Sequence, residues 1–207
     1  MRRSLPTRRA AAGFRLIEVL VSILIIVVGL LGLAGMQARA QISELESYQR
    51  AQALVLLYDM TDRINNSRTT ASCFVSAAGD YYGDTTDPVT LACGVGNPAD
   101  QAMTIASMTA WHNLLQGASE TKSGGATKVG AMIGARGCVS YDTTTEYLNT
   151  TGAAISGTGE YTVMVSWQGM ADTFAPTKTC GTAAQYGSDA KRRTVWATMR
   201  VGTLATR

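Results

Sequence analysis

The longest apolar run of the chain lies near its N-terminus. Residues 19–36 carry no charged side chain and a single hydroxyl, Ser22. At a rise of about 1.5 Å per residue, a helix of this length spans most of a hydrocarbon core of about 30 Å. The run therefore predicts a transmembrane helix, with one carboxylate, Glu18, at its head.

After Met36 the apolar positions keep a helical spacing but alternate with polar ones. We expect residues 37–67 to continue the same helix and to end at the polar stretch Asn65–Ser67. An apolar stripe along it would pack on the following domain, and the stripe consists of Leu54, Leu57, Tyr58, Thr61 and Ile64.

The remaining residues, 68–207, predict a globular α+β domain. A short helix is expected at residues 103–117, within a region rich in threonine, serine, glycine and alanine. Period-two alternation then predicts three strands, at residues 137–142, 160–169 and 193–201. The simplest arrangement is an antiparallel sheet that packs on the long helix.

The charge distribution sets the expected orientation. The formal charge of the 207 residues is +3, but the four leading arginines precede the apolar run, and without residues 1–13 there are 14 basic and 15 acidic groups. These arginines hold the N-terminus in the cytoplasm by the positive-inside rule and place the rest of the chain outside. The nearly neutral remainder argues against nucleic acid as the main partner.

Four cysteines follow the apolar run, and none belongs to a CxxC pair: Cys73, Cys93, Cys138 and Cys180. With one histidine in the chain, His112, the usual zinc patterns are missing, so no metal site is expected. An even cysteine number outside the cytoplasm predicts two disulfides. Of the three possible pairings, Cys73–Cys93 and Cys138–Cys180 are favoured because they close separate local loops.

A cleaved secretory signal is the simplest alternative to an anchor. Ala38–Ala40 reads A-x-A, and cleavage there would leave Gln41 as the first residue. The apolar run is longer than the usual signal core, however, and Arg15 and Glu18 intrude near its start. A carboxylate at this depth is expected to have a partner or a function. A cut between Gly13 and Phe14 would create an α-ammonium group that could pair with Glu18 of a neighbouring chain.

The leader and the stretch GFRLIEVLVSILI resemble the class III signal and N-terminal helix of type IV pilins and pseudopilins. This resemblance implies that prepilin peptidase cuts after Gly13 and methylates the amine of Phe14. Glu18 would then guide the subunit into a filament. Arg15 departs from the commonest pattern, in which a small or polar residue follows the aromatic.

The stretches LLGLAGMQARAQ and SYQRAQALVLLYDMTDRINNS are similar to the PilV family of minor pilins, the type IV pilus modification proteins. Together with the signal, the resemblance covers about a third of the chain. It implies four regions: a leader (1–13), a membrane and filament-core helix (14–36), its amphipathic continuation (37–67) and a globular domain (68–207). The implied fold is pilin-like α+β.

The resemblance also implies where the protein acts and with which partners. The chain would sit in the bacterial inner membrane with its C-terminal domain in the periplasm and then enter a pilus, supporting twitching motility and attachment. Its partners would be prepilin peptidase, the major pilin, other minor pilins, the assembly platform and a large tip adhesin. No cofactor is implied.

Other functions have weaker support in the sequence. A type II secretion pseudopilin shares the same N-terminus, whereas an enzyme finds no GxSxG, P-loop, GxGxxG or HExxH motif. His112 could in principle act as a base, and Asp59 with Asp62 could hold a cation. The cluster Lys191–Arg193 could contact DNA phosphates, although such a cluster more often guards an edge strand.

Overall fold

The structure is a computed structural model of the chain. It forms two compact units, Met1–Glu44 and Leu45–Arg207, and each is described by itself. The residues it describes are 16–77, 79–84, 91–118, 120–121, 128, 130 and 132–202.

The first helix, α1, runs without interruption through 51 residues, Leu16–Asn66. Glu18 lies in its first turn and Arg63 in its last, where each charge is favourable to the helix dipole. The helix thus continues past Met36, and it ends beside Asn65, where the sequence places its end.

The buried face of α1 shares Leu57 and Ile64 with the predicted stripe, whereas Leu54 and Thr61 are only half-buried. Its buried residues follow one another at intervals of three or four, so they share a face: Gln49, Ala53, Leu57, Met60 and Ile64. Tyr58, which the sequence placed on this stripe, is instead exposed. It follows Leu57 directly and so lies about 100° further round the helix.

The second helix, α2, spans Pro98–Leu115 and begins five residues before the predicted start. Asn97 caps it by accepting a hydrogen bond from the Asp100 amide at 2.9 Å, and Pro98 occupies the first helical position, where its missing N–H costs nothing. A 3₁₀ helix, η1 (Arg68–Phe74), follows α1. The other short helices are η2 (Thr143–Thr145), η3 (Ala183–Tyr186) and η4 (Asp189–Lys191).

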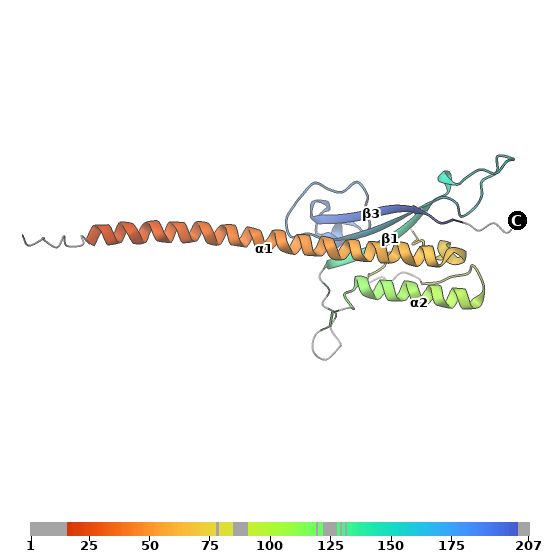
Figure 1. The fold of residues 1–207 in the computed structure, drawn as a ribbon, viewed down its shortest axis with the longest axis horizontal. Helices are drawn as coiled ribbons and strands as arrows, with labels where there is room; N and C mark the ends of the chain where they lie inside the picture. Colours follow the sequence, from red (N-terminus) through yellow and green to blue (C-terminus); the bar gives the residue numbers. More distant parts are fainter. Residues whose placement is uncertain are drawn as a thin grey trace, which may run out of the picture. The chain divides into compact units, whose positions relative to one another are not determined.

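Three strands form one antiparallel sheet in the order β1-β2-β3. They span Ile133–Asp142, Glu160–Gln168 and Arg192–Arg200. The period-two prediction is confirmed, because alternate residues of β2 from Tyr161 to Trp167 enter the main core. The described chain is thus an α+β protein with a long apolar N-terminal helix (Figure 1).

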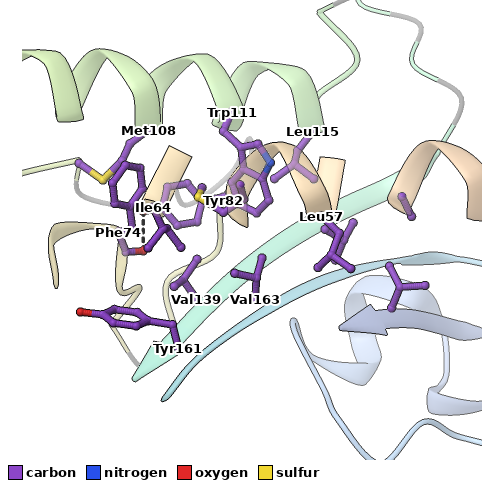
Figure 2. Close-up of a cluster of buried hydrophobic side chains, with 14 of the residues drawn as sticks. Leu57, Ile64, Phe74, Tyr82, Met108, Trp111, Leu115, Val139, Tyr161 and Val163 are labelled. Carbon is purple, nitrogen blue, oxygen red and sulfur yellow. Dashed lines mark hydrogen bonds between the residues drawn. The ribbon is translucent and has the colours of Figure 1, made fainter. Parts of the chain in front are cut away.

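The main core lies where α1, α2 and the sheet meet (Figure 2). Trp111 of α2 is fully buried, and its indole N–H donates to the Leu56 carbonyl of α1 at 2.9 Å. Tyr82 packs edge-on against Trp111, with ring centroids 5.0 Å apart, and donates to the Phe74 carbonyl at 2.9 Å. These bonds satisfy the polar ends of both buried aromatics.

Candidate functional site

The N-terminal half of α1 exposes all of its apolar side chains. Every large apolar residue from Leu16 to Met36 is exposed, with fractions between 40% at Val19 and 78% at Leu16. A continuous apolar surface of this kind is unfavourable in water and calls for lipid or other helices around it. By length and composition α1 can span a membrane, and no second helix among the described residues meets that test.

Glu18 is the one acidic residue between Leu16 and Met36. Its backbone carbonyl accepts a hydrogen bond from the Ser22 hydroxyl at 2.7 Å, which satisfies the hydroxyl within the helix. No ion pair of the Glu18 carboxylate occurs within the described part of the chain. The carboxylate therefore stands on the apolar surface of the helix without a partner from the described residues.

The predicted cleavage site, Gly13 and Phe14, lies outside the described residues, as does Arg15. The first described residue is Leu16, two positions before Glu18.

Two disulfides join the cysteine pairs that the loop lengths favour. Cys73–Cys93 links η1 to the segment before α2, and Cys138–Cys180 links β1 to the segment before η3. Cys138 and Cys180 form a second, smaller buried cluster with Met164 of β2. The second disulfide therefore covers the face of the sheet that points away from the main core.

Two of the three residues in the predicted basic cluster form ion pairs within the fold, which weakens the candidate DNA contact. Arg192 is only 5% exposed; its guanidinium pairs with Asp189 at 2.7 Å and donates to the Gly181 carbonyl at 3.1 Å. Arg193 pairs with Glu46 at 3.1 Å and donates to the Ala171 carbonyl at 2.8 Å. Lys191 is half-buried. Both arginines thus stabilise the fold.

Glu46 is a residue whose role the sequence pattern did not predict. Besides pairing with Arg193, its Oε1 accepts hydrogen bonds from the amides of Met170 at 3.1 Å and Ala171 at 3.4 Å. It thereby fastens α1 to the segment between β2 and β3. Its partners lie more than 120 residues away along the chain, so no local pattern could have identified them.

His112 accepts a hydrogen bond through Nδ1 from the Gly83 amide at 3.1 Å, and its Nε2 lies 2.8 Å from the side-chain amide of Gln116. Burial lowers its pKa, and the nearby charges of Lys128 and Arg136 lower it further, against the opposing effect of Asp84. A neutral imidazole in this position holds the turn at Gly83 against α2.

Asp59 and Asp62 do not form a cation site. Asp59 pairs with Arg63 at 2.8 Å, and the same guanidinium donates to the carbonyl and hydroxyl oxygens of Ser107 at 3.1 and 3.0 Å. The pair thus links α1 to α2. Among the described residues no three His, Cys, Asp or Glu side chains are grouped as metal ligands require.

Comparison with known proteins returns no relative: no family model, curated protein or solved structure matches this chain.

Proposed function

We propose that this protein is a minor pilin of the PilV type that takes part in the initiation and assembly of type IV pili, and thereby in twitching motility and attachment. Prepilin peptidase cuts it after Gly13 and methylates Phe14. The mature chain then waits in the inner membrane, with its C-terminal domain in the periplasm, until it enters a pilus with the major pilin and other minor pilins.

One observation carries this proposal: a single carboxylate, Glu18, in the first turn of a helix whose following apolar residues are all exposed. Such a charge is costly to a permanent anchor, because a carboxylate near hydrocarbon needs a partner. It is useful to a helix that leaves the lipid. The ammonium group of Phe14 in an adjacent subunit would neutralise it and define how the two helices align.

The two disulfides support the proposal independently. Cys73–Cys93 and Cys138–Cys180 both lie beyond the apolar half of α1, and disulfides persist in oxidising compartments. That location agrees with the orientation set by the leading arginines, which places residues 37–207 outside the cytoplasm.

A pseudopilin of type II secretion is the nearest alternative, since the N-terminal features above suit both systems. Deletion of the gene distinguishes them: the pilin proposal expects surface pili to be lost while secretion continues. The DNA-uptake function loses support, because Arg192 and Arg193 are occupied by carboxylate and carbonyl groups of the same chain.

Replacement of Glu18 by alanine tests the proposed role of its carboxylate. We expect Glu18→Ala to be cleaved normally, since the cut lies five residues away, but to enter sheared pili at a level reduced about tenfold, as for loss of one ion pair in a poorly hydrated setting. Ser22→Ala is the matched control, because it removes a polar group one turn further along the same surface. Normal incorporation of Glu18→Ala would refute the pairing role.

A further inference from the structure

The third strand, β3, has an outer edge whose backbone groups pair with no other strand among the described residues. In an antiparallel sheet, successive residues of a strand direct their N–H and C=O groups alternately to one neighbour and the other. Gly137 and Val139 of β1 bond outward, to Tyr82 and Ser76. The register of the three strands then fixes the alternation across the whole sheet.

On that register, the even-numbered residues of β1 bond to β2, and the odd-numbered residues of β2 bond to β3. The backbone groups of Thr194, Trp196 and Thr198 therefore point away from the sheet. Within the described part of the chain, β3 pairs with no strand other than β2, and none of the isolated bridges involves it.

The side chains along this edge are suited to a further strand. From Thr194 to Met199 the strand carries no charge, and Trp196 is 50% exposed on the face away from the main core. Ala197 and Met199 are half-buried at the border of the main core. A strand added here would extend the sheet, cover Trp196 and complete the burial of these two residues.

Two lysines lie beside or just before this strand. Lys178 lies over the Trp196 ring, 5.8 Å from its centroid, and Lys191 precedes the strand. Neither lysine takes part in an ion pair with another described residue, whereas Arg192, Arg193 and Arg200 are each paired with a carboxylate. The unpaired lysines favour an acidic segment as the occupant.

A second copy of this chain fits the edge poorly. Each copy would bring its own Lys178 and Lys191 to the shared edge, and like charges oppose such pairing. Symmetric parallel pairing fails because it sets each outward-bonding residue opposite its own copy, whereas a parallel pair needs the opposite residue to direct its backbone groups the other way. The β1 edge offers no alternative partner, since Tyr82 and Ser76 already occupy it.

We propose that the outer edge of β3 binds an extended, acidic segment of a different protein, which pairs with Thr194, Trp196 and Thr198 as a fourth strand. The exclusion of a second copy rests on the lysines and on the strand register, so this proposal does not depend on the proposed function.

Two defined peptides test the proposal on the full chain in detergent micelles. Each has alternating threonine and valine residues, with an aspartate at both ends of one peptide and a lysine at both ends of the other. We expect saturable binding of the aspartate peptide, with amide hydrogen exchange slowed at Thr194, Trp196 and Thr198 and unchanged at Val195 and Ala197. The lysine peptide should bind about fivefold more weakly.

Thr198→Pro removes one outward N–H without removing a hydrogen bond to β2, and Thr198→Val is the matched control that retains it. The proline variant should lose about tenfold in affinity for the aspartate peptide and the valine variant almost nothing. Three results would overturn the proposal: no saturable binding, equal binding of the two peptides, or β3 amides already protected in a dimer of the free chain. None of these results depends on cleavage at Gly13, so the proposed function is tested separately.

Discussion

At the scale of single residues, the tightest packing in the core is between a glycine and a tryptophan. A Cβ atom at Gly137 would lie 2.1 and 2.3 Å from two ring carbons of Trp111 and 2.8 Å from the Leu115 side chain. The absence of a side chain at this position is what lets the indole lie directly on β1.

We therefore expect Gly137→Ala to destabilise the fold by about 1–3 kcal/mol, the usual cost of overpacking a core. Gly94→Ala is the matched control, because a Cβ there meets nothing within 4 Å and the residue has no positive φ. Urea unfolding of the full chain in micelles, followed by tryptophan fluorescence, measures both. Equal stability of the two variants would show that Trp111 does not pack on Gly137.

His112 makes the stability depend on pH in a defined direction. Its pKa in the folded chain is lowered below the usual 6.5, so below pH 6.5 the unfolded chain binds the proton more readily than the folded one. The contribution of neutral His112 to the folding stability is complete above pH 6.5. It is lost as the pH falls from there towards the lowered pKa of His112. His112→Asn keeps an acceptor for the Gly83 amide but does not titrate.

Urea midpoints of the wild-type chain should fall as the pH is lowered from 7.5 to 5.5, and those of His112→Asn should fall less. The prediction fails if the two chains lose stability in parallel, because the pH dependence would then come from other groups.

Residue roles were predictable from the sequence only where a local pattern defines them. Glu18 stands out because the 18 residues that follow it carry no charge. By contrast, the partners of Arg193 and Arg136 lie 147 and 52 residues away, at Glu46 and Asp84. A run of basic residues therefore looked like a surface cluster, although folding directs two of its three side chains to carboxylates.

At the scale of elements, the sheet and long helix were predictable because each has a periodic pattern of its own. The alternation in β2 defined its two faces, and the charge-free run defined the start of α1. The start of α2 was missed because its first turn is polar. The Asn97–Pro98 signal, rather than apolar spacing, marks where that helix begins.

The two disulfides should contribute unequally to stability. In the chain-entropy account, the 42-residue separation of Cys138–Cys180 gives about 0.7 kcal/mol more than the 20-residue separation of Cys73–Cys93. Removal of Cys138–Cys180 also exposes Met164 and opens the small cluster on the outer face of the sheet. We expect the Cys138→Ala, Cys180→Ala chain to lose about 3–5 kcal/mol and the Cys73→Ala, Cys93→Ala chain about 2–3 kcal/mol.

Urea unfolding of the two double variants under non-reducing conditions compares these losses directly. A greater loss of stability in the Cys73→Ala, Cys93→Ala chain would contradict the prediction that Cys138–Cys180 stabilises the fold more.

At the scale of the whole molecule, one continuous helix serves two units with different surroundings. From Leu45 onwards α1 buries a stripe of side chains against α2 and the sheet, which the main core requires. From Leu16 to Met36 its apolar side chains meet no other part of the described chain and remain exposed. The structure thus supplies packing for one half of the helix and leaves the other to an external apolar environment.

This division is compatible with the proposed function as a subunit that moves from the membrane into a filament. Lipid and a bundle of like helices are both apolar, so transfer between them would change little in the burial of residues 19–36. In that proposal the carboxylate of Glu18 favours the bundle, because only the bundle would offer it the ammonium group of Phe14 in a neighbouring subunit.

The mass and N-terminal sequence of the membrane-bound protein test this account most directly. Purified from cells with active prepilin peptidase, the protein should begin at Phe14, and its mass should include one methyl group on the amine. A chain that begins at Gln41, or that retains Met1 in those cells, would contradict the account.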